Sequence, residues 1–397
     1  MVLTLFAILI AGLAVLGVVA GLVPRIAVVA GTAGLCGLVV MLALAVLVNG
    51  GGPTTLELPV GPPGAALYFA LDPLAASFLL LLFVVVPCGD AAPLPLAAIG
   101  ITLLAHDCFT LVVGLLLLGG TALLRFTASA AACLIIAFAL AGPLGDFAAI
   151  RAAPPAGWHA SAVLLLVLAG AGVLSRVNTT IAVYLVLRVL FDLCGEGQPL
   201  WWGVPLLVAG AGIAAIGALR AALADTLHTV LSVGSLHLFG MAAMALGVAL
   251  FARAVDLPSV AVQALDAAWL GLVCHVLSRT LLVLCASAVE SGAGTRRLDR
   301  LGGLIHRMPV TAATCLVGLF AVAVLPPGLG FAAFWLVFQS LLAAARIGGL
   351  GLQLLIVSVT VLAALSVGLA GLAAVRRSPR HAAITATASS PATAIGE

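Results

Sequence analysis

Apolar runs long enough to cross a lipid bilayer recur along almost the whole of this 397-residue chain. A helix of about 20 apolar residues spans the hydrocarbon core of a bilayer. Long runs lie near 3–22, 26–48, 67–88, 108–124, 129–146, 202–222, 228–251, 264–288, 310–326, 331–345 and 350–374, and shorter or interrupted ones near 93–105, 160–174 and 177–194. They lack the apolar–polar alternation of transmembrane β-strands. The sequence therefore predicts an all-α polytopic bundle of about 12–14 transmembrane helices.

The two ends of the chain differ in character. The first apolar run has no positively charged residues before it and is followed at once by a second run, so we expect a retained helix and not a cleaved signal peptide. From residue 376 onward the chain becomes small and polar, which is typical of a disordered tail. We therefore expect a helix bundle over 1–375 and a disordered tail over 376–397.

Composition argues against several classes of function. Only 7% of the residues are charged, the net charge is +3, and all sixteen basic side chains are arginine. No basic patch suited to nucleic acid and no glycine-rich phosphate loop is present. The cysteines are scattered without a CxxC pair or a His/Cys cluster, so we expect no metal and no cofactor. They are Cys36, Cys88, Cys108, Cys133, Cys194, Cys274, Cys285 and Cys315.

Membrane orientation stays open. Arginines cluster in 296–307 and again in 376–380, and basic loops favour the cytoplasm. Three apolar segments separate the clusters, which would place them on opposite faces of the membrane. Either one segment is re-entrant, with the Pro326-Pro327 break as its expected place, or one cluster violates the rule. The proline pair either frees carbonyl groups that line an ion path or only kinks a helix.

Ionisable residues inside the apolar runs are costly in lipid and usually face the interior of a bundle. Histidine titrates near neutral pH and can relay protons. We therefore treat five residues as candidates for a proton path, with satisfied polar contacts between helices as the alternative reading. They are Asp225, His228, His237, His275 and Arg279.

A second group of ionisable residues has a structural or orienting role in our interpretation. Arg188 and Asp192 lie four residues apart near a predicted helix end, so they can pair with each other. Arg220 and the proline pair Pro326 and Pro327 belong to the same group.

Several segments carry a family resemblance. The stretch from SRVNTTIAVY at 175–184 through DTLHTVLSVGSLHLFG at 225–240 resembles the central part of the antiporter-like membrane subunits of the respiratory complex I and hydrogenase-4 family. LDRLGGLIHRMP at 298–309 and VLPPGLGFAAFWLVFQSLL at 324–342 fit the same pattern. Within that family the chain resembles the large membrane subunits of hydrogenase-4 and formate-hydrogenlyase complexes more closely than those of complex I. The resemblance covers about residues 56–345, and some regions of this chain are shorter than in the family.

The resemblance implies a fold and a function. Members are bundles of about fourteen helices with two inverted repeats and two broken helices. A chain of buried charged residues is thought to move protons, driven by electron transfer in partner subunits. We therefore expect a subunit of the bacterial inner membrane that binds no cofactor. If it belongs to an oxidoreductase complex, we expect it to be a non-catalytic membrane subunit of that complex. Its expected partners are other membrane subunits and iron–sulfur, hydrogenase-like or dehydrogenase-like subunits.

The chain departs from the family pattern at most charged positions. Leu116 replaces a glutamate, Thr180 a broken-helix lysine, and Phe334 an acidic residue. By the same alignment His228 replaces a lysine and His237 a glutamate. Arg279 also replaces a lysine, while His275 is kept. Arginine keeps the charge of lysine but does not release its proton at physiological pH.

Two readings of these departures stay open. Either the proton path is lost or crippled, or protons move along a rewired path of His228, His237 and His275. The alternative functions are a structural anchor that transports nothing and a stand-alone cation/proton antiporter. The missing acidic residues argue against the antiporter, because cation coordination needs oxygen ligands.

Overall fold

The computed structural model describes residues 2–50, 54–58, 67–85, 92–119, 123–141, 147–175, 177–195, 198–222, 226, 229, 236–293, 307–322, 326 and 328–348. Contacts divide the chain into two compact units, Met1–Trp202 and Gly203–Glu397. The expected tail over 376–397 and the expected span over 350–374 lie outside the described residues.

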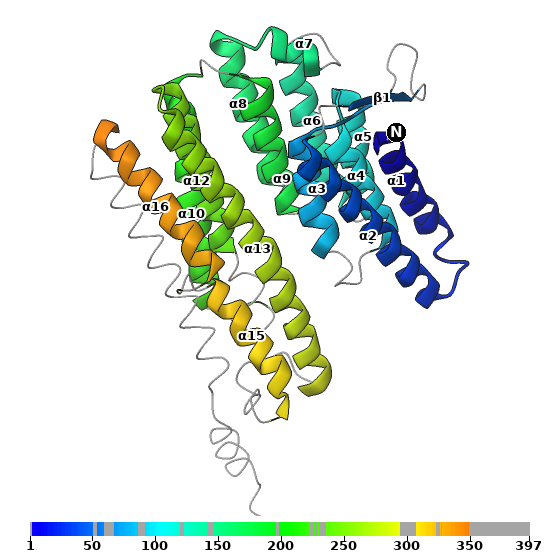
Figure 1. Cartoon of the computed structure of the whole chain (residues 1–397). Coiled ribbons are helices and arrows are strands. Elements are labelled where there is room, and N and C mark those ends of the chain that lie inside the picture. The colour runs from blue at the N-terminus through cyan, green and yellow to red at the C-terminus, as the bar shows by residue number, and fades with distance from the viewer. Residues whose placement is uncertain are drawn as a thin grey trace, which may run out of the picture. The chain divides into compact units, whose positions relative to one another are not determined.

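Unit 1 is a set of apolar helices with one small antiparallel sheet (Figure 1). Its elements are α1 (Val2–Val19), α2 (Arg25–Asn49), β1 (Thr54–Leu58), β2 (Leu67–Leu71), α3 (Pro73–Val85), α4 (Pro93–Leu104), α5 (Cys108–Gly119), α6 (Leu124–Ala141), α7 (Phe147–Ala152), α8 (Gly157–Leu174), α9 (Thr179–Val186), the π-helix η2 (Leu187–Leu193) and the short 3₁₀-helix η3 (Leu200–Trp202). Asn178 begins α9 by accepting hydrogen bonds from the backbone N–H groups of Thr180 and Ile181.

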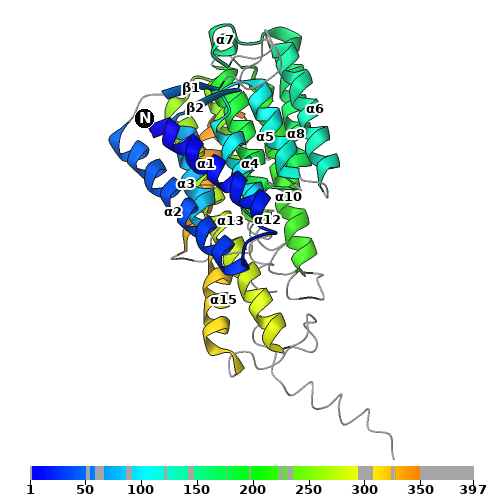
Figure 2. The same ribbon diagram turned by 90° about the vertical axis from the view of Figure 1, so that its right-hand side faces the viewer.

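The strands and α7 lie at the same end of unit 1 in two perpendicular views (Figures 1 and 2). β1 pairs with β2 from Thr54 opposite Leu71 to Leu58 opposite Leu67. Phe69 of β2 also bridges to Ala105, just beyond α4. This end of the unit therefore gathers the turns that lead into α3 and α5.

Unit 2 is built from five helices among its described residues: α10 (Gly203–Ala222), α12 (Leu236–Ala254), α13 (Pro258–Ala293), α15 (Pro309–Val322) and α16 (Leu329–Gly348). The 36 residues of α13 make a helix of about 54 Å, longer than the roughly 30 Å hydrocarbon core. Its core cluster joins α12, α13 and α15 through residues such as Met241, Leu282 and Leu319.

Glycine spacing sets how closely α10 and α12 pack. Gly210 and Gly240 face each other so tightly that a Cβ on Gly240 would lie 2.5 Å from the carbonyl oxygen of Gly210. Gly203 and Gly247 repeat this contact seven residues along each helix. Small residues permit such close backbone approach in membrane helices.

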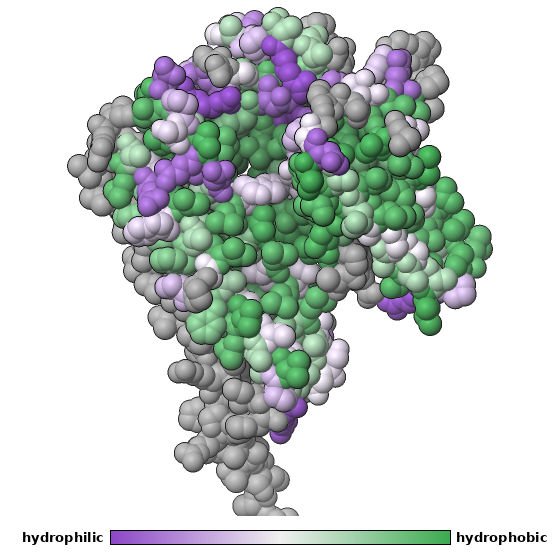
Figure 3. All heavy atoms as spheres, in the orientation of Figure 1, coloured by the Kyte–Doolittle hydropathy of each residue, from purple (hydrophilic) through white to green (hydrophobic). Residues whose placement is uncertain are grey.

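Length and composition make seven helices apolar enough to cross a membrane, among the described residues. The face of unit 1 seen in Figure 3 is largely hydrophobic, as expected for lipid contact. The all-α prediction is confirmed, with one local difference: the run at 67–88 begins as the strand β2 and becomes helical only at Pro73. Strand and helix are hard to separate in short apolar runs.

Candidate functional site

A cluster of alternating charges lies in unit 1. One nitrogen of Arg188, Nη1, donates hydrogen bonds to Oδ2 of Asp72 and, over 2.9 Å, to Oδ2 of Asp192. Asp192 also accepts two hydrogen bonds from Arg151, from Nε at 2.9 Å and from Nη2 at 2.5 Å. The expected pairing of Arg188 with Asp192 is therefore present, and two further residues complete it.

The cluster is graded from the interior of the unit to its surface. The side chain of Arg188 is 1% exposed, that of Asp72 19%, that of Asp192 30% and that of Arg151 32%. Asp72 directly follows β2, and Arg151 lies in the last turn of α7. These partly exposed residues therefore lie at the end of unit 1 that carries β2 and α7. A buried guanidinium is thereby neutralised by carboxylates that water reaches.

The two carboxylate oxygens of Asp72 have different partners. Oδ1 accepts a 2.8 Å hydrogen bond from the backbone N–H of Ala75 and so caps α3, while Oδ2 binds Arg188. Asp107 caps α5 in the same way through Thr110 N–H at 2.9 Å, and its other oxygen accepts from Tyr68 N–H. Asp72 therefore couples the start of α3 to the charge cluster.

Aromatic rings enclose the guanidinium of Arg188. Its Cζ lies 5.8 Å from the ring centroid of Tyr184 and 5.9 Å from that of Phe147. Both rings are fully buried. Ring faces attract cations at such distances, so these contacts add to the carboxylates in holding the charge.

Arg188 and Asp192 lie on the π-helix η2, in which backbone hydrogen bonds join residues five positions apart. The N–H of Cys194, for example, donates to the carbonyl oxygen of Val189 over 3.0 Å. Gln198 supports this end of the helix by donating from Nε2 to the carbonyl oxygens of Leu190 and Gly195. π-Helical turns are frequent at functional sites.

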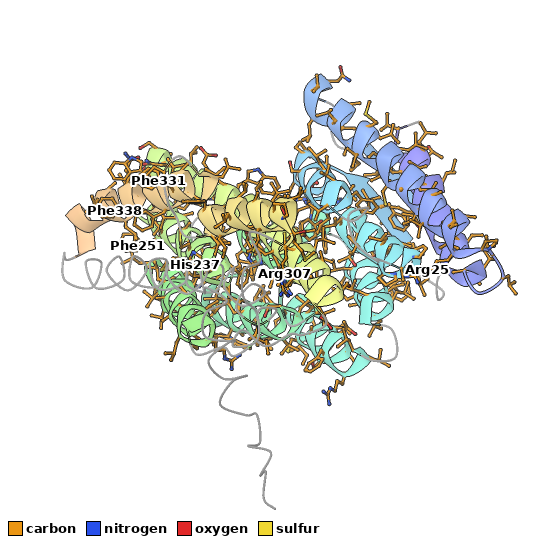
Figure 4. The ribbon with its side chains drawn as sticks, turned by 90° about the horizontal axis from the view of Figure 1, so that it is seen from below. Arg25, His237, Phe251, Arg307, Phe331 and Phe338 are labelled. Carbon is orange, nitrogen blue, oxygen red and sulfur yellow. The ribbon has the colours of Figure 1, made fainter. Side chains whose placement is uncertain are left out.

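Unit 2 buries two of the predicted proton-path residues on neighbouring helices. His237 of α12 is 0% exposed and His275 of α13 is 1% exposed. Phe239, two residues after His237, places its ring centroid 5.9 Å from that of His275. Figure 4 labels His237 among the helices of this unit. Both imidazoles thus lie in the interior of unit 2.

One helix ends and the next begins close to Cys274, the sequence neighbour of His275. α15 ends at Val322 and α16 begins at Leu329, with Pro326 in an exposed turn between them. The thiol of Cys274 lies 3.8 Å from the carbonyl oxygen of Ala321, at the end of α15. The predicted break is therefore present at Pro326, and it brings a terminal helix carbonyl to the residue next to His275. Pro327 lies outside the described residues.

The other residues predicted from the sequence are either exposed or lie outside the described residues. Arg279 and Arg220 are exposed, so the structure does not bring Arg279 into the interior with His275 one helical turn away. Asp225 and His228 lie outside the described residues. Neither Asp72 nor Arg151 was among the candidates, because their separations of 116 and 41 residues from their partners leave no pattern in the sequence.

The three uncharged replacements have unlike surroundings. Leu116 is 37% exposed on α5, whereas Thr180 is 4% exposed in the first turn of α9. Phe334 packs against the core cluster of unit 2. In the described part of the chain, no three His, Cys, Asp or Glu side chains are close enough to hold a metal ion.

Comparison with known proteins gives the chain its relatives. Hydrogenase-4 component B of Escherichia coli is 35% identical over 205 residues, which are 51% of this chain and 29% of that protein. Formate hydrogenlyase subunit 3 of E. coli is 34% identical over 164 residues, 41% of this chain and 27% of that protein. The matched segments thus span less than a third of either relative.

A solved structure shares the fold. A chain of respiratory complex I from Thermus thermophilus with bound NADH superposes with a TM-score of 0.72 at 19% identity, covering 95% of this chain and 88% of that one. The protein is a multi-pass membrane protein. The sequence model described as NADH:quinone oxidoreductase/Mrp antiporter, TM matches residues 65–363, about three quarters of the chain. The chain therefore belongs to the NADH:quinone oxidoreductase/Mrp antiporter transmembrane family.

Proposed function

We propose that this chain is a membrane subunit of a hydrogenase-4, formate-hydrogenlyase or NADH-quinone-oxidoreductase-like complex, in which electron transfer drives proton translocation. The partners would be other membrane subunits and iron–sulfur, hydrogenase-like or dehydrogenase-like subunits, in a bacterial inner membrane. Family membership and the two E. coli relatives support this assignment.

The observation that carries a transport role is the burial of His237 and His275 on adjacent helices, with Cys274, the neighbour of His275, at the end of α15. A titratable imidazole is expensive to bury in lipid unless it is used or satisfied, and broken helices commonly line ion paths in transporters. The proposed path uses these two histidines together with His228 and Asp225, with Arg279 contributing a fixed positive charge.

In our proposal this path conducts protons less well than the paths of other family members, because three of the family's charged positions are uncharged here. Leu116 and Phe334 cannot exchange a proton, and Thr180 carries no charge. A wire across about 30 Å of hydrocarbon needs several proton-binding groups. Among the described residues, the two histidines are the ionisable side chains other than cysteine thiols that lie fully inside unit 2.

The test has two stages. Mild-detergent affinity purification of the tagged chain should recover iron–sulfur and hydrogenase-like or dehydrogenase-like subunits, identified by mass spectrometry. The purified complex is then reconstituted in liposomes, and proton uptake is measured during electron transfer. His275→Gln and His237→Gln should each lower proton uptake per electron while subunit composition is kept. His159→Gln, at an exposed histidine, serves as the matched control.

Other outcomes select the alternatives. Normal complex composition without proton uptake in the wild type would identify a structural anchor. Loss of subunits in the histidine variants would give these side chains a role in assembly. Recovery of the chain alone, with cation-driven proton exchange, would identify a stand-alone antiporter.

A further inference from the structure

Arg188 uses only one of its three donor nitrogens for its aspartates. Both carboxylates bind Nη1, whereas Nε and Nη2 have no hydrogen-bond partner among the described residues. These two nitrogens are buried, and the whole side chain is 1% exposed. A buried unpaired donor costs about 1–3 kcal/mol, and more when it is charged.

The two unpaired donors point the same way. Nε–H and Nη2–H lie side by side on one edge of the planar guanidinium, as a fork that matches oxygen acceptors. This edge is closed to bulk solvent, because both nitrogens are buried and the whole side chain is 1% exposed. The acceptor must therefore be small.

Charge decides between a neutral acceptor and an anion. Arg188 and Arg151 carry two positive charges, and Asp72 and Asp192 two negative ones, so the cluster is neutral. An anion would leave an uncompensated charge in a low-dielectric interior, which is costly. A water molecule accepts from both donors and adds no charge. Buried waters typically bind polar groups that the protein leaves unsatisfied.

We propose that the Nε/Nη2 edge of Arg188 is a binding site for internal water in unit 1, within a charge cluster whose other members Asp192 and Arg151 are partly exposed. This site is separate from the histidines of unit 2 and does not depend on the proposed transport function. It hydrates a charged cluster that also reaches the cap of α3. Arg188 is then a water-holding residue as well as an ion-pair partner.

Hydroxyl-radical footprinting of the intact, purified protein tests this site. X-ray radiolysis of bound water oxidises side chains beside it, even when bulk solvent does not reach them. Tyr184 and Phe147 should therefore be oxidised several-fold faster than Phe83, which is equally buried in the same unit. In H₂¹⁸O the added oxygen should carry the label. Oxidation of both rings at the Phe83 rate would overturn the proposal.

A charge-balanced double variant assigns the water to the guanidinium. Arg188→Met combined with Asp72→Asn removes one positive and one negative charge, leaves the Arg151–Asp192 pair, and keeps an Asn that can cap α3. Oxidation of Tyr184 and Phe147 should fall to the Phe83 rate. Asp72→Asn alone keeps the fork and should keep the labelling.

Two results would reject the assignment. Unchanged labelling in the double variant would mean that other groups hold the water. Saturable protection of the wild type by chloride, formate or phosphate at constant ionic strength would mean that the fork binds an anion. If the double variant does not fold, the wild-type comparison with Phe83 and the anion titration still decide the question.

Discussion

The hydroxyl group of Tyr184 donates a 2.7 Å hydrogen bond to the carbonyl oxygen of Leu103, which joins α9 to the end of α4 across 81 residues of sequence. The Tyr184 ring also meets Phe78 edge to face, with centroids 5.3 Å apart. One side chain thus connects three helices one turn before Arg188.

Tyr184→Phe should therefore lower the free energy of unfolding by about 1–3 kcal/mol, because it leaves a buried carbonyl oxygen unpaired while the ring contact is kept. Thermal unfolding in detergent measures the effect. Tyr68→Phe is the matched control, since the Tyr68 hydroxyl bonds Glu57 at an exposed position and its loss should change stability little. Equal effects of the two substitutions would contradict this role of Tyr184.

The glycine contact between α10 and α12 leads to a second prediction. Gly240→Ala places a methyl group 2.5 Å from Gly210 O and 2.6 Å from Ala214 N, so the helices must separate. Overpacking of this kind costs about 1–3 kcal/mol. Thermal unfolding of unit 2, followed by cysteine reactivity at Cys274, should shift to lower temperature.

Gly212→Ala is the control, because no atom lies within 4 Å of a Cβ at this position. It should leave stability unchanged or raise it, since alanine favours helices more than glycine does. Destabilisation of the Gly212 variant to the same extent would mean that the cost comes from the helix backbone and not from the contact.

Replacing Thr180 with the lysine of the family pattern should destabilise the protein. Its side chain is 4% exposed in the first turn of α9, where Asn178 caps the helix. A lysine would bring a cation to the positive end of the helix dipole and bury it. Thr180→Lys should lower expression and the unfolding temperature, whereas Thr180→Val should be tolerated better. A stable Thr180→Lys protein with increased proton uptake would show that the family path is easily restored.

The sequence predicted the parts of the fold that depend on local pattern. Apolar length located the helices, the proline pair located the break before α16, and a four-residue spacing located the Arg188–Asp192 pair. It could not supply Asp72 or Arg151, because distant elements bring them to Arg188 and Asp192 and no periodicity encodes that contact. The strand β2 was hidden for a related reason: an apolar run of five residues has no helical or strand signature of its own.

The last prediction separates the two aspartates of the cluster. Asp192→Asn removes the charge that Arg188 and Arg151 share, so both guanidinium groups lose a charged acceptor. Asp72→Asn leaves Asp192 on Arg188 and keeps an oxygen that can cap α3. Asp192→Asn should therefore cost more stability, by about 1–2 kcal/mol, a moderate value because solvent screens a carboxylate that is 30% exposed. Detergent unfolding of both variants at pH 7 measures the difference. A larger loss in Asp72→Asn would mean that the buried pair with Arg188, and not the shared aspartate, holds the cluster together.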